Sequence, residues 1–383
     1  MESDLVPRRD ITPMRAVLLT AAALLSSGLF GATASLQNTP RNPYTQPATA
    51  FYEVERWPAP FASPGFVSAS NTGIFVESPE RIFLLTRGEV RVPDRLPPDF
   101  NGTIASLPPE GRAKAELRNC IVVANGRGEV LERWTQHDHL FAAGGRGPHR
   151  VKISPYDPQR HVWVVDDSGN QIFKFTNDGK TLVMRLGVAG VRGADATHFA
   201  GPTDLAWLPD GSFFVADGYV NSRVVKFDAN GKYLASWGTK GTAPGQFDVP
   251  HAIDVDRNRR VYVADAHNSR IQVFDERGQF LDQWPNIWRP DVIMVSADQH
   301  LWIAAGATNM LLKYDLNGKL LQAWGTAGTA PGAFQDIHGF GVDSKGTFYA
   351  AEAAGGRTQK LTPKPGADPA MLVGLQPPLA SKR

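Results

Sequence analysis

The chain has 383 residues and a nearly balanced charge, with 40 Lys and Arg against 38 Asp and Glu and a formal net charge of +2. This balance, with no basic run that contains interleaved aromatic residues, argues against a nucleic-acid partner. The single cysteine excludes an intramolecular disulfide, and the 37 Gly and 29 Pro are typical of a folded chain with many turns.

The N-terminus has the pattern of a secretory signal peptide. Three arginines precede an apolar run at residues 16–29, and Ala-Thr-Ala at 32–34 has the form of a cleavage site. The apolar run is too short to span a bilayer comfortably. We therefore expect residues 1–34 to be a signal peptide, the mature chain to have no transmembrane segment, and the protein to be periplasmic or secreted. Residues 35–50 predict a disordered lead-in.

A first group of strands follows. The segment 66–69 predicts the start of a first blade, with its second strand at 81–86 and an insertion at 92–118 whose role the sequence leaves open. An earlier strand at 52–57 is expected to complete the last blade of a closed ring, because closure removes an exposed sheet edge.

A repeated pattern then runs along the rest of the chain. Each copy has a turn with Pro or its equivalent, a short apolar strand, a second turn and a second apolar strand. The copies begin at residues 149, 203, 251, 291 and 338, in steps of 54, 48, 40 and 47 residues. Such spacing is the period of a four-stranded propeller blade. The clearest copy predicts strands at 203–208, 212–216, 223–228 and 234–237.

The repeats predict an all-β fold, a six-bladed β-propeller over residues 51–363, and they resemble the NHL type. Residues 364–383 predict a C-terminal tail. The first strand of each propeller blade lines the central channel, so the residues at the strand starts converge at one mouth of that channel. In blade order these positions hold Val67 or Ser68, His149, Thr203, His251, Asp291 and His338.

Histidine therefore occupies alternate blades. One histidine at a strand start is usually a packing residue, but three at equivalent positions favour a metal site. Three imidazoles with an open fourth position are the pattern of catalytic zinc, and an all-imidazole set favours zinc over iron or manganese. We expect His149, His251 and His338 to bind Zn²⁺.

Residues that follow the second strand of a blade return to the same mouth. They include Tyr219 in the third blade and Arg87 in the first. A tyrosine beside a metal can act as a general base when its pKa is depressed, and an arginine can hold an anion. Each residue also has an ordinary interpretation, as a stacked loop tyrosine and as a surface salt bridge.

Three segments resemble the peptidyl-α-hydroxyglycine α-amidating lyase family, also called peptidylamidoglycolate lyases. They are Phe-Ala-Gly-Pro-Thr-Asp at 199–204, Ala-Asp-Gly-Tyr-Val-Asn-Ser-Arg at 216–223 and Pro-Gly-Gln-Phe-Asp-Val-Pro-His at 244–251. The resemblance covers most of residues 65–362. It implies a six-bladed NHL-like propeller and an enzyme that releases an amide and glyoxylate.

The resemblance also implies site residues. The family's three zinc histidines correspond to His149, His251 and His338, its catalytic tyrosine to Tyr219 and its catalytic arginine to Arg87.

Two of the positions that depart from the family pattern concern ligand binding. The family's substrate-binding arginine directly follows the Ala-Asp of the fourth blade, where this chain has Ala266. The family's structural Ca²⁺ uses an aspartate directly after the third zinc histidine, where this chain has Gly339. A Ca²⁺ site would therefore need other ligands, such as the backbone carbonyls of Val67 and Val151.

These observations favour an exported, monomeric, zinc-dependent carbon–nitrogen lyase that acts on a small molecule or a peptide. One alternative is a propeller enzyme of the lactonase or streptogramin-lyase type, although such sites favour carboxylates or a different His/Glu set. The other is a non-catalytic NHL propeller that binds a protein or a glycan, because fold alone does not fix function.

Overall fold

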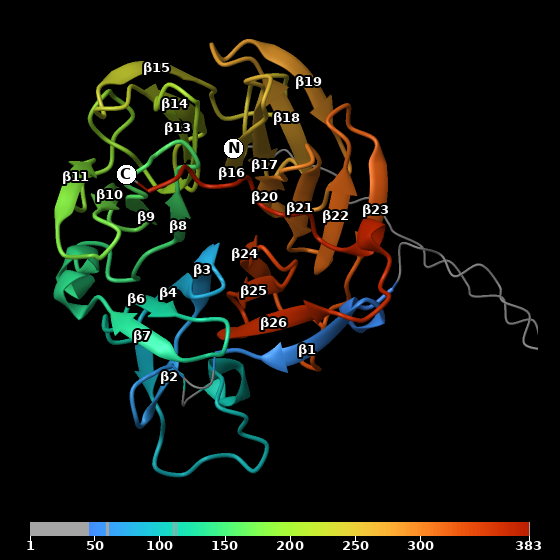
Figure 1. Ribbon diagram of the computed structural model, residues 1–383. Coiled ribbons are helices and arrows are strands. Elements are labelled where there is room, and N and C mark those ends of the chain that lie inside the picture. Colours follow the sequence, from blue (N-terminus) through green and yellow to red (C-terminus); the bar gives the residue numbers. More distant parts are fainter. Residues whose placement is uncertain (1–45, 59–60, 110–111, 113, 383) are drawn as a thin grey trace, which may run out of the picture. The chain divides into compact units, whose positions relative to one another are not determined.

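Six four-stranded antiparallel sheets surround a central axis, with their first strands innermost (Figure 1). The structure is a computed structural model and describes residues 46–58, 61–109, 112 and 114–382. All of these residues belong to one unit, Asn42–Arg383. The predicted signal peptide and residues 35–45 of the predicted lead-in lie outside the described residues.

The first three blades each use four strands from one stretch of chain. Blade 1 contains β3 (Asn71–Ser78), β4 (Arg81–Thr86), β6 (Ile121–Ala124) and β7 (Val130–Arg133). Blade 2 contains β8 (Arg150–Ile153), β9 (Val162–Asp166), β10 (Gln171–Phe175) and β11 (Leu182–Leu186). Blade 3 contains β12 (Pro202–Trp207), β13 (Phe213–Asp217), β14 (Arg223–Phe227) and β15 (Tyr233–Trp237), within one residue of the predicted bounds.

The remaining blades close the ring. Blade 4 contains β16 (Pro250–Val255), β17 (Val261–Asp265), β18 (Arg270–Phe274) and β19 (Phe280–Trp284). Blade 5 contains β20 (Pro290–Val295), β21 (Leu301–Ala305), β22 (Met310–Tyr314) and β23 (Leu320–Trp324). Blade 6 joins β24 (Ile337–Val342), β25 (Phe348–Glu352) and β26 (Arg357–Pro363) to β1 (Tyr52–Arg56), which confirms the predicted closure by the N-terminal strand.

The burial of the strands explains their composition. Every residue of β13 is buried, because this strand lies between two neighbouring blades, and its sequence is apolar up to Asp217. The outer strand β15 alternates between half-buried and exposed residues, so it tolerates polar side chains on one face. The helical elements whose bounds the structure gives are short 3-10 turns: η2 (Ala48–Ala50), η3 (Ile104–Ser106), η5 (Thr135–Phe141) and η6 (Pro369–Met371). None of them has the length and apolar character of a membrane span.

A buried ion pair recurs where the second strand of a blade meets the third. A carboxylate that ends the second strand accepts a hydrogen bond from Nε of the arginine directly opposite it. The pairs are Asp217–Arg223 at 2.8 Å, Asp265–Arg270 at 2.8 Å and Glu352–Arg357 at 2.9 Å. Blade 2 keeps the carboxylate as Asp166 but places Gln171 opposite it. Oδ2 of Asp166 is consequently buried without a hydrogen-bond partner among the described residues.

The predicted start of blade 1 at residues 66–69 was wrong. Residues Phe66–Ser68 form β2, which pairs with β5 (Glu89–Arg91) in a separate two-stranded sheet, and blade 1 begins at β3. The predicted insertion at 92–118 explains the error. Apolar residues of this insertion form a small hydrophobic cluster outside the blades, in which Val67 packs with Val90 and Leu107.

Residues 373–382, part of the segment predicted as a tail, cross the channel mouth opposite the strand starts, and we call them the strap. The strap runs across the centre of the ring in Figure 1, in red. The backbone N–H of Ala297 donates to the carbonyl of Leu375 at 2.7 Å, and that of Ala380 donates to the carbonyl of Pro155 at 2.9 Å. The strap is thereby held by blades 5 and 2 together.

Candidate metal centre

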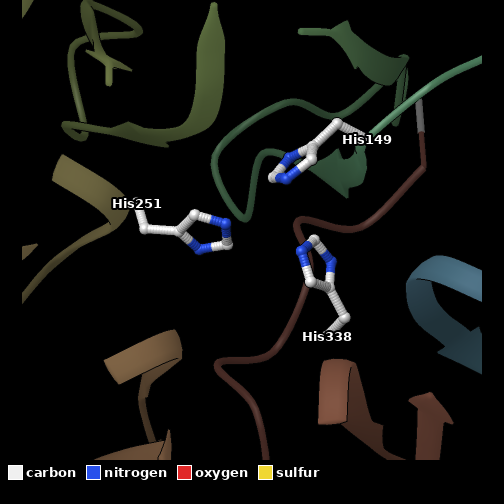
Figure 2. A group of neighbouring side chains, drawn as sticks. All are labelled: His149, His251 and His338. Carbon is white, nitrogen blue, oxygen red and sulfur yellow. The ribbon is translucent and has the colours of Figure 1, made fainter. Parts of the chain in front are cut away.

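Three imidazoles meet at one mouth of the channel. His149 directly precedes β8, and His251 and His338 are the second residues of β16 and β24. One ring nitrogen from each lies within 4.8 Å of the others, and all three residues are buried. Figure 2 shows the three rings pointing toward a common centre from different blades. Among the described residues, this is the one cluster of three or more His, Cys, Asp or Glu side chains with that spacing.

Backbone carbonyls of the intervening blades orient the rings. The Nδ1 atoms of His149, His251 and His338 lie 2.8, 2.7 and 2.9 Å from carbonyl oxygens. Those oxygens belong to Thr203, Asp291 and Thr72. Because a carbonyl only accepts hydrogen bonds, each Nδ1 carries the proton and each Nε2 keeps its lone pair.

Around the ring, a blade whose first strand starts with a histidine therefore alternates with a blade that supplies a backbone carbonyl at the same position. Each carbonyl orients the histidine of the blade before it. The residue that fills this role in blade 1 is Thr72, so the prediction of Val67 or Ser68 for that position was wrong. The cause is the displaced start of blade 1, because residues 66–68 pair outside the blade sheet.

The electrostatics keep the rings neutral. Burial is the main cause that lowers the pKa of all three histidines, and Arg150 adds to the effect at each of them. Neighbouring imidazoles lower the pKa of His149 and His338 further. The pKa of His251 falls to about 3. Neutral imidazoles with converging Nε2 lone pairs are the donors that a zinc-like divalent ion requires, so the three residues can hold a metal ion.

Tyr219 reaches the same centre from the loop after β13. Its hydroxyl oxygen lies 3.0 Å from Nε2 of His149 and 2.8 Å from Nε2 of His251. The loop approaches closely because Gly201, at φ +74°, would place a Cβ only 2.7 Å from the Cβ of Tyr219. The residue is 40% exposed, so the phenol connects the buried centre with the mouth. Burial raises the pKa of Tyr219, and the carboxylate of Asp167 raises it further.

Arg87 lies at the same mouth, with its guanidinium held by Asp167. The two side chains form a bidentate pair, with Nη–Oδ distances of 2.7 and 3.0 Å, and one Nη also donates to the carbonyl of Gly147. The charge of Arg87 is close enough to lower the pKa of both Tyr219 and His149. Asp167 was not predicted from the sequence, although it directly follows the second strand of blade 2, the position from which residues overhang the mouth.

A second guanidinium that the sequence analysis missed faces the mouth from the loop between blades 4 and 5. Nε of Arg289 donates to Asp291 at 2.9 Å, and one Nη pairs with Asp336. The Arg289 side chain is 42% exposed, and its charge lowers the pKa of His251. Burial raises the pKa of Asp291, while Asp336 supplies a second carboxyl group to the same guanidinium. The chain has Ala266 at the position of the family's substrate-binding arginine, but Arg289, between blades 4 and 5, supplies a guanidinium at the same mouth.

The residues below the histidines do not fit a calcium ion. A Cβ at Gly339 would lie 2.9 Å from the backbone nitrogen of Ile74 and 3.0 Å from Cα of Gly73, so the family's aspartate has no room there. A cation is already present, because the guanidinium of Arg150 donates to the carbonyls of His338 at 2.5 Å and Asp291 at 3.2 Å.

Comparison with known proteins agrees with this fold. A family model described as NHL repeat matches residues 247–274, which span most of blade 4. The solved structure titled "Streptogramin B lyase structure" shares the fold, with a TM-score of 0.52 and 13% identity, and the match covers 83% of this chain and 99% of that chain. The protein is therefore a six-bladed β-propeller with NHL repeats.

Sequence relatives define the family more closely. A probable peptidyl-alpha-hydroxyglycine alpha-amidating lyase of Caenorhabditis elegans is 32% identical over 54% of this chain and 62% of its own length. Mouse peptidyl-glycine alpha-amidating monooxygenase is 32% identical over 63% of this chain and 24% of its own length. The resemblance to the peptidyl-α-hydroxyglycine α-amidating lyases is confirmed, and it favours an enzyme of the propeller type. The chain spans about a quarter of the mouse protein and less than two thirds of the nematode protein.

Proposed function

We propose that the protein is an exported, zinc-dependent lyase that cleaves the C–N bond of an α-hydroxyglycine-type carbinolamide to an amide and glyoxylate or a related aldehyde. The observation that carries the proposal is the contact of the Tyr219 hydroxyl with Nε2 of two of the three converging histidines. A proton acceptor and a metal-binding set therefore share one centre. Export rests on the signal-peptide pattern at 1–34.

His149, His251 and His338 would hold the metal ion through their Nε2 atoms, with Nδ1 fixed by carbonyls. When bound, a Zn²⁺ ion supplies Lewis acidity, which makes a nearby hydroxyl a stronger acid.

Tyr219 would accept the proton of the substrate's α-hydroxyl. The electron pair of that O–H bond then forms the aldehyde carbonyl, the C–N bond breaks, and the nitrogen takes a proton to complete the amide. Water is neither consumed nor released, so the reaction is an elimination and not a hydrolysis. The phenol needs a lower pKa than burial alone gives it. A cation beside its oxygen supplies that shift, because positive charge favours the phenolate.

The cations at the mouth would orient the substrate. Arg87 is fixed by its bidentate pair with Asp167, so its guanidinium keeps one direction beside the phenol. Arg289 is the more exposed of the two cations, because its side chain is 42% exposed against 11% for that of Arg87. We assign the anionic end of the substrate, the carboxylate of a hydroxyglycine, to Arg289.

Metal analysis of the signal-free protein tests this proposal. We expect about one zinc per chain and its loss in the His149→Ala/His251→Ala double variant. The zinc-loaded protein should release glyoxylate from a peptide that ends in α-hydroxyglycine. No bound metal after zinc is supplied would rule out the catalytic assignment. Bound zinc without glyoxylate release would retain the metal centre and reject the substrate.

A further inference from the structure

A second cavity lies at the end of the channel opposite the histidines. Its volume is about 320 Å³, and its lining includes Ile153, Val255 and Val295, which end the first strands of blades 2, 4 and 5. The histidines stand at the other ends of the first strands. His251 and Val255 are four residues apart on β16, or about 13 Å at the usual rise of a strand. The cavity is thus separate from the candidate metal centre.

Arg150 stands between the two sites and lines the cavity. The residue is only 3% exposed, and its two Nη atoms donate to the carbonyls of His338 and Asp291. Its Nε is buried without a hydrogen-bond partner in the described part of the chain. Oδ1 of Asp204 is 3.6 Å away, too far for a hydrogen bond. A buried N–H without an acceptor is destabilising, so a ligand oxygen there would be stabilising.

The charges of the lining favour an anion. Arg150, Lys152 and Arg257 line the cavity, against a single acidic residue, Asp254. Lys152 is paired with Asp204 at 2.9 Å, and burial raises the pKa of Asp254. The positive charge of Arg150 and Arg257 therefore exceeds the negative charge that the lining supplies.

The remaining walls are apolar. Val151, Ile293 and Phe340 line the cavity from three blades, and Pro377 and Leu379 of the strap close its outer side. Small-molecule sites commonly combine such walls with a few polar groups that fix orientation, and 320 Å³ is within their usual size range. We propose that this cavity is a ligand site, distinct from the metal centre, for a small monocarboxylate with an apolar body. The carboxylate pairs with Arg150, and the strap covers the apolar body.

Decanoate is a suitable probe, with decan-1-ol as its uncharged counterpart. The zinc-loaded protein is labelled with [¹³C-methyl]methionine, because Met294 lines the cavity while Met184 lies on β11, the outer strand of blade 2. Decanoate at up to about 1 mM, the range of a weak small-ligand site, should shift the Met294 signal saturably and leave the Met184 signal in place. Decan-1-ol should bind at least about tenfold more weakly, because it cannot form a charge-assisted bond.

Two variants and a control test whether the charge of the lining contributes to binding and whether the site is independent of the metal centre. Arg257→Ala, which removes an exposed charge of the lining, should weaken decanoate binding by about three- to tenfold. Arg277→Ala removes an exposed arginine on a blade 4 hairpin and should change nothing. His251→Ala should retain the Met294 shift, because the cavity does not use the metal.

Three outcomes would overturn the proposal. An unchanged Met294 signal means that the cavity holds solvent only. Equal affinities for decanoate and decan-1-ol mean that Arg150 recognises no anion. Loss of the shift in His251→Ala places decanoate at the metal centre. All three outcomes leave the proposed lyase activity untouched, because it is measured by glyoxylate release.

Discussion

The hydroxyl oxygen of Tyr219 lies 2.8 Å from Nε2 of His251, closer than the 3.0 Å that separates it from Nε2 of His149. The phenol therefore touches the face of the histidine cluster on which a metal ion would sit, while its ring extends toward solvent. A residue in this position can act on a metal-activated substrate without being needed to retain the metal.

Replacing the phenol tests this separation of roles. Tyr219→Phe should lower kcat by about 10²- to 10⁴-fold, the range of general acid–base catalysis, with zinc content unchanged. The assay is glyoxylate release, measured beside elemental analysis of the same samples. Tyr156→Phe, an exposed tyrosine at the opposite mouth, is the matched control. Full activity in Tyr219→Phe would show that another group takes the proton.

Asp167 should act through Arg87. Asp167→Asn removes the charge that holds the guanidinium but keeps the side-chain shape, so Arg87 loses its fixed direction. We expect a fall in kcat of about tenfold or more with KM nearly unchanged, because orientation matters most in the transition state. The pH profile should also shift to lower pH, because Asp167 raises the pKa of Tyr219. An unchanged profile with lower stability would indicate a purely structural pair.

The incomplete ion pair of blade 2 offers a stability test. Burial raises the pKa of Asp166 to about 6, against about 3.9 in an unfolded chain. The folded state therefore binds this proton more tightly, so the contribution of Asp166 to stability is greatest below pH 4 and is lost as the pH rises through 6.

Gln171→Arg restores the arginine found opposite the acid in blades 3, 4 and 6. It should raise the free energy of unfolding by about 2 kcal/mol at pH 7.5 and have no effect at pH 3.5, where Asp166 is protonated in both states. Urea unfolding at the two pH values measures this difference. Gln171→Met, without a charge, should give no gain at pH 7.5, and a gain equal to that of arginine would contradict the explanation.

The histidines predict the opposite pH dependence. Their pKa values are lower in the folded protein than the usual value of about 6.5, so the unfolded state binds more protons as the pH falls. Metal-stripped protein should thus lose stability steadily from pH 6.5 down toward pH 4. The expected slope decreases in His338→Gln but not in His267→Asn, whose ring is exposed. Identical slopes in the two variants would exclude the buried rings as the cause.

Much of the architecture could be predicted because each blade repeats a local pattern. The turn and the two apolar strands of blade 3 depend on nearby residues, as does the hairpin at Asn230-Gly231 between β14 and β15, so their bounds follow from the sequence. The register of the strand starts brought His149, His251 and His338 together for the same reason. Blade 1 could not be assigned correctly, because Val67 is apolar to cover an insertion and not to line the channel.

Residues that act through long-range contacts gave weaker signals. Asp167 and Arg87 are 80 positions apart, and the bond between Arg150 and His338 joins blades 2 and 6. The strap has no strand periodicity, since its hydrogen bonds go to single carbonyls and amides of different blades. Such contacts form only in the closed ring, so no short segment of the sequence predicts them.

The sheet of blade 6 has a consequence for timing. Tyr52 of β1 lies opposite Pro363 of β26, so the ring closes only when almost the whole chain has been made. The third imidazole, that of His338, also comes from this last blade. A nascent chain that ends before blade 6 offers only two of the three nitrogen donors. If the protein binds a metal ion as proposed, capture of that ion would be a late event in folding, and the ions available where folding is completed would decide which one is bound.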